Sequence, residues 1–296
     1  MHQPPVTEAA VAPRGRFAPS PTGPLHLGSL VTALASWLDM RSRNGEWLVR
    51  IDDIDPPREV PGAADTILRQ LEVHGLEYDG SPRYQSRHGE AFSAAVEELL
   101  AAGHAFHCSL SRRQLAGYGG VHPGPAVAVP PGPDRAIRLC VPREPVQFHD
   151  ELQGPVSVAL DAEGPFVIRR RDGLFAYQLA SALDEVLLGI TDVMRGTDLL
   201  ESTARQLHVL HSLGHEGPRW AHLPIVVDTQ GHKLSKSEGA AALDPENPAA
   251  NLARALTCLG VPPPQALQEA PVDALLQWAL PQWQRDTVAG RNRVEP

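Results

Sequence analysis

One stretch decides the fold that we expect for this chain: RFAPSPTGPLHLGS, which runs from Arg16 to Ser29. Its first six residues contain two prolines, which exclude a helix there and favour an extended segment. Thr22-Gly23-Pro24 then predicts a turn, and a helix opens behind it and continues to about residue 43. Apolar residues of this helix fall on one face, at positions 27, 30, 31, 34, 35 and 38. We therefore expect a strand, a tight turn and a helix N-terminus in direct succession.

This arrangement is typical of a phosphate-binding site. The first N–H groups of a helix and the positive end of its dipole favour a bound anion. Gly23 and Gly28 allow a bulky ligand to come close to the backbone, and the imidazole of His26 can donate to a phosphate oxygen. The alternative is an ordinary strand–helix turn in which His26 only caps the helix.

A second stretch favours the phosphate-binding interpretation. Lys233-Leu234-Ser235-Lys236-Ser237 follows Gly231 in a polar loop. Lys233 and Lys236 are the only lysines among the 26 Lys and Arg residues of the chain. A lysine offers a mobile point charge that can follow a polyphosphate through a reaction, whereas arginine offers a rigid planar fork. The alternative here is a solvated surface loop.

The two stretches resemble the "HIGH" and "KMSKS" signatures of class I aminoacyl-tRNA synthetases. RFAPSPTGPLHLG and LVRIDDIDPPRE (residues 48–59) are together similar to the glutamyl branch of this family, and the similarity extends from about residue 14 to about residue 243. The resemblance implies an α/β fold: a Rossmann-like, parallel-sheet, nucleotide-binding catalytic domain with an inserted α+β subdomain and a short helical C-terminal tail.

The local amino-acid composition suggests where these parts lie along the chain. We expect a disordered tail over residues 1–13, the catalytic domain over 14–103 and 174–240, the inserted, acceptor-facing subdomain over 104–173, and a helical segment over 241–296. Prolines and glycines crowd the inserted segment, and short β-like runs follow at 136–141 and 164–169. A further strand is expected at 46–52, and the last one before the lysine loop at 223–228. Residues 241–296 leave no room for the large anticodon-binding domain of glutamyl-tRNA synthetases.

The resemblance also implies which residues contact the substrates. ATP with Mg2+ would be bound by Pro19, Gly23, His26, Gly28, Ser29, Lys233 and Lys236, of which His26, Ser29 and Lys236 would be catalytic. L-glutamate would be bound by Arg16, Phe17, Ala18, Pro19, Ser20, Asp52, Tyr177 and Arg195.

The chemistry of three of these side chains suits a dicarboxylic amino acid. Arg16 and Arg195 can each hold a carboxylate through a bidentate fork. Asp52 follows a strand and stands where the family usually has Glu near the substrate amino group; its side chain is one methylene shorter, so a bridging water would complete the contact. The alternative for Arg195 is a structural ion pair with Asp192 or Asp198.

By resemblance, the reaction is a tRNA-independent activation of glutamate by ATP, followed by transfer of glutamate to queuosine in the anticodon of tRNA(Asp). This acceptor comes from the family alone, since no residue pattern indicates it. Three alternatives remain open: a truncated glutamyl-tRNA synthetase, an ATP-dependent activator of another small carboxylic acid, and an inactive paralogue that acts as a sensor.

Relatives often carry a zinc site in the inserted segment, built from Cys-x-Cys with further Tyr and Cys ligands. This sequence has Cys108-Ser109-Leu110 there, and Gly124-Pro125-Ala126 where the last Cys would lie. A substitute site would have to be drawn from His104, His107, Cys108, Tyr118 and His122. Because structural zinc needs four committed ligands, we expect neither zinc nor any other metal site in the protein itself.

Composition limits the setting in which the chain acts. A formal net charge of −9 argues against indiscriminate nucleic-acid binding, although Arg112-Arg113 and Arg169-Arg170-Arg171 are candidate RNA-contacting patches, if they are not simply scattered surface arginines. The 3 cysteines are too scattered for a disulfide framework, which indicates a reducing cytoplasm. The sequence contains no apolar run that could span a membrane. We expect a cytoplasmic monomer.

Overall fold

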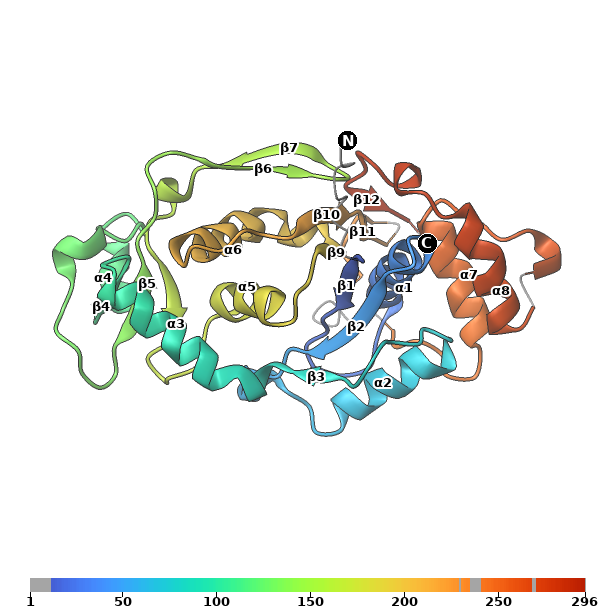
Figure 1. Cartoon of the computed structure of the whole chain (residues 1–296), viewed down its shortest axis with the longest axis horizontal. Helices are drawn as coiled ribbons and strands as arrows, with labels where there is room; N and C mark the ends of the chain where they lie inside the picture. The colour runs from blue at the N-terminus through green and yellow to red at the C-terminus, as the bar shows by residue number, and fades with distance from the viewer. Residues whose placement is uncertain (1–11, 229, 235–240, 268–269, 296) are drawn as a thin grey trace, which may run out of the picture.

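The computed structural model describes residues 12–228, 230–234, 241–267 and 270–295. The expected tail over residues 1–13 lies almost wholly outside these residues. Within the described part of the chain, a seven-stranded sheet has the order β3-β2-β1-β9-β10-β6-β7 (Figure 1). Its strands are β1 (Arg14–Phe17), β2 (Glu46–Ile51), β3 (Arg83–Tyr84), β6 (Val146–Asp150), β7 (Gly154–Val158), β9 (Asp192–Gly196) and β10 (Arg219–Leu223). All neighbours pair in parallel except β6 and β7, which form an antiparallel hairpin, so the expected α/β fold with a mainly parallel sheet is confirmed.

The opening stretch forms the expected strand–turn–helix unit. Helix α1 (Leu27–Ser42) connects β1 to β2, and the six residues of its predicted apolar face are all buried. This face belongs to the largest hydrophobic core, which also contains side chains of α7 (Pro248–Cys258) and α8 (Val272–Ala279). The C-terminal helices therefore pack beside α1, at one end of the molecule (Figure 1).

A second core lies on the other side of the sheet's centre. It joins α3 (Gly89–Ala101), α5 (Tyr177–Leu187) and α6 (Leu200–Ser212) to a three-stranded antiparallel sheet. That sheet consists of β4 (Ala105–Cys108), β5 (Ala136–Leu139) and β8 (Phe166–Arg169), at the far end of the molecule from α7 and α8 (Figure 1). The remaining α-helices that the structure describes are α2 (Ala63–Val73) and α4 (Arg112–Ala116).

The structure differs from the expected last strand, residues 223–228. That strand is divided at Pro224, which has no N–H to donate to a sheet. Before it, β10 belongs to the central sheet; after it, β11 (Ile225–Val226) pairs instead with β12 (Arg293–Val294). A further finding concerns the segment 104–173: its hairpin β6–β7 extends the central sheet, while β4, β5 and β8 form a sheet of their own.

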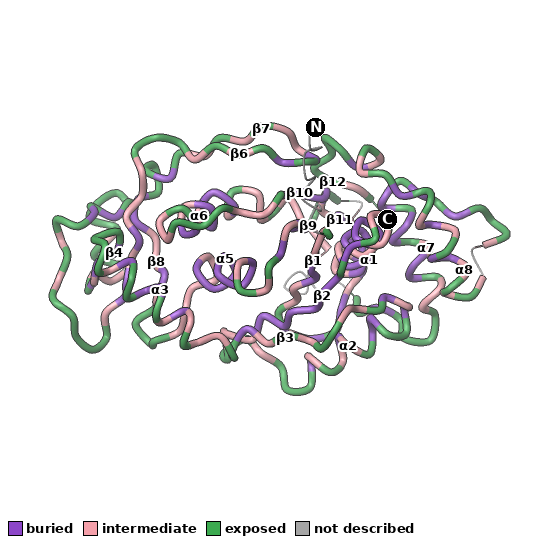
Figure 2. Tube along the Cα trace, in the orientation of Figure 1, coloured by how far each residue is buried: buried purple, intermediate pink, exposed green. Residues whose placement is uncertain are grey.

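Burial follows this layout. The buried positions concentrate in α1, in β1 and β2 and in the helices that flank the sheet, whereas the β6–β7 hairpin and the loops around β4 carry many exposed residues (Figure 2). Among the described residues, no helix combines the length and the apolar character needed to cross a membrane.

Candidate active site

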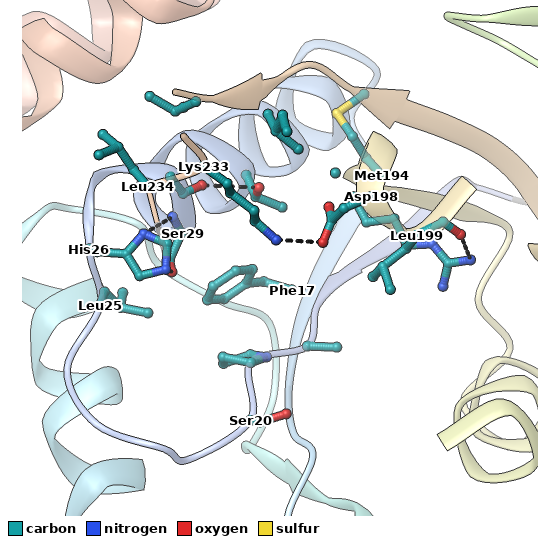
Figure 3. A pocket seen from close by; sticks show the side chains of 18 of the residues that line it. Phe17, Ser20, Leu25, His26, Ser29, Met194, Asp198, Leu199, Lys233 and Leu234 are labelled. Carbon is teal, nitrogen blue, oxygen red and sulfur yellow. Dashed lines mark hydrogen bonds and ion pairs between the residues drawn. The ribbon is translucent and has the colours of Figure 1, made fainter. Parts of the chain in front are cut away.

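A cavity of about 640 Å³ lies at the carboxyl ends of β1, β9 and β10, beside the N-terminus of α1 (Figure 3). Open parallel sheets bind ligands at this edge. We call it the first cavity. Its lining comes mainly from the end of β1 and the residues after it (16–20), the start of α1, the end of β9 and the residues after it (194–199), and residues 224–226 with 233–234; Arg58 and Tyr177 also line it.

His26 caps the helix that borders this cavity. Its Nδ1 accepts a hydrogen bond from the backbone N of Ser29 at 3.3 Å, and its Nε2 lies 3.0 Å from the Ser29 Oγ. Since a neutral imidazole has one donor and one acceptor nitrogen, Nε2 is the protonated one and donates to Ser29. The helix N-terminus, an imidazole and a hydroxyl thus lie at one wall of the cavity.

The lysine loop begins at the same wall. Lys233 and Leu234 line the first cavity, and a Cβ atom at Gly28 would lie only 3.2 Å from the Leu234 carbonyl oxygen. Glycine at position 28 therefore allows the two stretches to approach each other. Lys233 Nζ donates to Asp198 Oδ2 at 2.6 Å, and Figure 3 shows this pair across the cavity from His26. Lys236 lies outside the described residues.

Arg195 is the most informative side chain of the site. It is buried, with 4% of its surface exposed, and the hydrogen-bond partners that the structure describes for it are all neutral. They are the Tyr177 hydroxyl at 3.3 Å, His222 Nε2 at 3.1 Å, Thr203 Oγ1 at 2.7 Å and the Leu199 carbonyl at 3.4 Å. Burial lowers the pKa of Arg195, but an arginine stays charged in a protein. A buried cation of this kind favours an anionic ligand in the cavity that it lines.

The alternative interpretation of Arg195 was wrong. Asp192 forms its ion pairs with other arginines, Arg43, Arg219 and Arg285, and Asp198 pairs with Lys233. No carboxylate of the described residues lies within ion-pair distance of Arg195.

A hydrogen-bonded chain behind Arg195 fixes its orientation. Asp150 Oδ2 lies 2.5 Å from His222 Nδ1, and Asp150 Oδ1 accepts the backbone N–H groups of residues 152, 153 and 222. His222 and Asp150 are both fully buried. Burial lowers the pKa of His222, which favours the neutral ring with its proton on Nδ1, facing Asp150. His222 Nε2 is then free to accept from Arg195 Nε.

A buried group of alternating charges borders the two cavities. Arg16 Nε is 3.0 Å from Glu185 Oε1, and Arg50 bridges the same carboxylate, at 3.3 Å, and Asp52 Oδ1, at 2.7 Å. Burial alone would raise the pKa of Glu185, but the two guanidinium groups lower it. Arg16 thus has a counter-charge within the protein, which distinguishes it from Arg195.

The first cavity brings together most of the expected site residues. Those that line it are Arg16, Phe17, Ala18, Pro19, Ser20, His26, Gly28, Ser29, Tyr177, Arg195 and Lys233. Gly23 lies in the adjoining turn, with a φ of 132° that favours glycine, and does not itself line the cavity. Asp52 lines a second cavity, also of about 640 Å³, which shares Ser20, Arg58 and Tyr177 with the first.

Sequence reasoning missed Asp150, His222, Thr203 and Glu185. The first two lie in segments expected to belong to different domains, and only the addition of β6 to the central sheet brings them into contact. Glu185 is an acidic residue within a helix, with no local signal that separates it from a surface acid.

The segment in which relatives often carry zinc holds a thiol–imidazole pair here. Cys108 Sγ lies 3.0 Å from His122 Nε2, and burial, together with the nearby Arg138 cation, lowers the pKa of His122 to about 4. Tyr118 is exposed. Across the described residues no group of three or more His, Cys, Asp or Glu side chains is placed to hold a metal ion. Two donors do not fit a structural zinc ion, which requires four.

Comparison with known proteins gives the class. The family described as class I tRNA synthetases (E and Q), catalytic domain, matches residues 13–120 and 130–268. The crystal structure of a glutamate tRNA ligase from Elizabethkingia meningosepticum has the same fold, with a TM-score of 0.81 at 24% sequence identity, over 96% of this chain and 67% of that one.

Two curated relatives indicate to which branch of the class I tRNA synthetases the chain belongs. A glutamyl-Q tRNA(Asp) synthetase of Pseudomonas aeruginosa is 50% identical over 271 residues, which cover 91% of this chain and 92% of the relative. The protein of the same name from Pseudomonas entomophila is 48% identical over 284 residues, 95% of this chain and 96% of its own. The chain therefore belongs to the glutamyl-Q tRNA(Asp) synthetase family of class I tRNA synthetases, and it is a ligase.

Proposed function

We propose that this ligase activates L-glutamate with ATP, without needing tRNA, and then transfers the glutamyl group to queuosine in the anticodon of tRNA(Asp). The observation that carries the glutamate assignment is Arg195, a buried guanidinium with neutral protein partners at the wall of the first cavity. The acceptor is supported by the names of the full-length relatives.

The side-chain carboxylate of glutamate binds Arg195 and the Tyr177 hydroxyl. These groups lie 3.3 Å from each other and can contact the same carboxylate, and the ligand supplies the directly paired carboxylate that no described residue gives Arg195. Asp52 lines the second cavity and contacts the substrate ammonium group through a bridging water. This contact is possible because the two cavities adjoin at Ser20 and Tyr177, which line both.

ATP binds with its phosphates at the N-terminus of α1. The Ser29 hydroxyl donates to a phosphate oxygen, and the Nε2–H of His26, which is directed at Ser29 in the free protein, donates to a phosphate oxygen instead when ATP is bound. Gly28 keeps the backbone accessible. Lys233 exchanges its carboxylate partner Asp198 for a phosphate, and Lys236 acts beside it on the leaving pyrophosphate. Mg2+ would arrive with ATP, neutralising charge on the phosphate oxygens; such an ion needs few protein ligands.

The chemistry takes place in two steps. An oxygen of the glutamate α-carboxylate attacks the α-phosphorus of ATP, the bond to the bridging oxygen breaks, and pyrophosphate leaves. A hydroxyl of the acceptor nucleoside then attacks the carbonyl carbon of the glutamyl-adenylate, loses its proton, and AMP leaves with the bonding electron pair. The protein contributes by positioning the reactants and neutralising their charge.

We further propose that segment 104–173 faces the RNA and that segments 14–103 and 174–240 carry the activation chemistry. The second cavity lies where these segments meet, since Phe166 and Arg170 of the inserted segment line it, and it adjoins the first cavity at Tyr177.

Two assays test the proposal. The purified chain should catalyse glutamate-dependent ATP–pyrophosphate exchange in the absence of RNA, and should charge queuosine-containing tRNA(Asp) but not tRNA(Glu). Exchange that depends on another acid would indicate an activator of a different carboxylic acid. Charging of tRNA(Glu) would indicate a truncated glutamyl-tRNA synthetase, and the absence of exchange would indicate a sensor. Each of these outcomes overturns the proposal.

Arg195→Lys, which keeps the positive charge of the side chain but loses its bidentate fork, should raise the KM for glutamate and leave the KM for ATP unchanged.

A further inference from the structure

We propose that the second cavity binds the acceptor nucleotide of the RNA, and that Arg170 and Arg58 hold its phosphate at the place where Asp55 lies in the free protein. This inference rests on the proposed function, because it assumes that the activated carboxyl group is formed in the first cavity.

The position of the second cavity supports this role. It is contiguous with the first cavity through Ser20, Arg58 and Tyr177. An attacking hydroxyl must reach the carboxyl carbon of a glutamate bound at Arg195 from a space that opens onto the first cavity. The second cavity is such a space, and its volume of about 640 Å³ is large enough for a nucleoside.

The charge of its lining suits a nucleic acid. Four arginines line the second cavity: Arg58, Arg138, Arg170 and Arg205. They face three carboxylates, of which Asp52 is already paired with the buried Arg50. The cavity thus carries an excess of positive charge in a chain whose formal net charge is −9. A local basic patch on an acidic protein favours a specific phosphate contact over general adhesion to RNA.

Aromatic side chains supply the second part of nucleotide recognition. Phe166, on β8, and Phe175, just before α5, are both half-buried and line the cavity. Proteins that read single-stranded RNA loops stack the exposed bases on such rings. Arg169 already lies over the Phe175 ring, 5.6 Å from its centroid, whereas Phe166 meets His208 in an edge contact, with the ring centroids 6.4 Å apart. Phe166 is therefore the ring that we assign to the base.

An ion-pair bridge marks the phosphate position. Asp55 Oδ1 lies 3.3 Å from Arg170 Nη1, while Asp55 Oδ2 accepts a short hydrogen bond from Arg58 Nε. The carboxylate joins a guanidinium that follows β2 to one that follows β8, from the two walls of the cavity. The two arginine side chains are 73% and 44% exposed, for Arg58 and Arg170, so the pairs contribute little stability and a phosphate can displace the carboxylate.

This geometry predicts effects of opposite sign for the two partners of one ion pair. Arg170→Ala should raise the KM for queuosine-containing tRNA(Asp) about tenfold, because a charge-assisted contact is lost. It should also reduce the slope of log KM against log salt concentration by about 0.7, the share of one phosphate on a single strand. Arg170 pairs with two carboxylates, Asp55 at 3.3 Å and Asp172 at 2.6 Å, of which Asp55 alone also holds Arg58. Asp55→Asn should lower the same KM about threefold, since it removes the competing anion that lies between the two arginines.

Glutamate-dependent ATP–pyrophosphate exchange separates RNA binding from activation. Arg170 lines only the second cavity, so Arg170→Ala should leave the exchange kinetics unchanged, including the KM for ATP. Arg254→Ala, which removes an exposed arginine on α7, is the matched control and should change neither reaction. Melting temperatures of all variants check that the fold is retained.

The outcomes are distinct. A wild-type chain without glutamate-dependent exchange or without transfer to RNA contradicts the proposed function itself. A wild-type chain that performs both reactions, with an Arg170→Ala variant that has the same KM and salt slope for RNA, overturns the present inference. So does an equal rise in KM for Arg170→Ala and Asp55→Asn, which would indicate a purely structural ion pair.

Discussion

Replacing Asp150 by Asn tests whether the chain of hydrogen bonds behind Arg195 governs the binding of glutamate. The substitution removes a charge and keeps the shape of the side chain. Asn Oδ1 would keep accepting the three backbone N–H groups that Asp150 Oδ1 accepts, at 2.9–3.1 Å, so the new NH2 group must face His222 Nδ1. Turning the amide around would aim that NH2 group at three donors. His222 is therefore forced to carry its proton on Nε2.

The size of the effect follows from what Arg195 loses. Its Nε donates to His222 Nε2 at 3.1 Å, and in the variant two N–H groups would point at each other. A hydrogen bond to a charged group contributes about 1.5–3 kcal/mol. We expect kcat/KM for glutamate to fall about 10- to 100-fold, since each 1.4 kcal/mol corresponds to about tenfold. The KM for ATP should not change, because the phosphates bind at the opposite wall.

The assay is ATP–pyrophosphate exchange with glutamate and ATP varied separately. Glu151→Gln is the matched control: it makes the same chemical change one residue further along, at an exposed carboxylate that pairs with Arg285. An Asp150→Asn variant that is folded and keeps the wild-type KM for glutamate would refute the reasoning. A parallel rise in the KM for both substrates would show general loosening of the site rather than misorientation of Arg195.

Three further predictions concern the rest of the chain. Gly28→Ala should raise the KM for ATP about 3- to 10-fold in the exchange assay, because the new Cβ would lie 3.2 Å from both the His26 ring and the Leu234 carbonyl and would press them apart. Hydrogen bonds from neighbouring arginines and a threonine lower the pKa of Asp192 to about 2, although burial opposes this shift. The ionised carboxylate therefore adds about 2 kcal/mol to the free energy of unfolding above pH 4, and this contribution should be lost as the pH falls from 4 to 2. Asp192→Asn should remove that pH dependence, as measured by urea titrations. A zinc chelator should leave the melting temperature unchanged, since Cys108 and His122 form a pair rather than a four-ligand site; a lower value would contradict this.

The sequence was most informative where a local pattern and a packing requirement coincide. The apolar face of α1 could be predicted because helical spacing directly determines which side chains enter the core. The stretch from Arg16 to Ser29 and the lysine loop were recognisable because glycine, histidine and lysine have few equivalents in phosphate binding. Their meeting at Gly28 is consistent with this expectation.

The contacts that could not be predicted are those that depend on the order of the strands in the sheet. Asp150 acts on Arg195 only because β6 pairs with β10, a neighbour distant in the sequence, and no local property of HDEL at 149–152 indicates this. The ion pair of Arg16 with Glu185 similarly joins β1 to α5. Such contacts arise from topology, so residue patterns alone identified the two arginines but not which of them has a carboxylate partner.

The pairing of β12 with β11 has a consequence for how the protein is made. β11 contributes Ile225 and Val226 to the wall of the first cavity, and its neighbour Val227 donates its backbone N–H to the Val294 carbonyl at 2.9 Å. During synthesis, the strand that leads into the lysine loop stays without its partner until Val294 has left the ribosome, long after helix α1 has emerged.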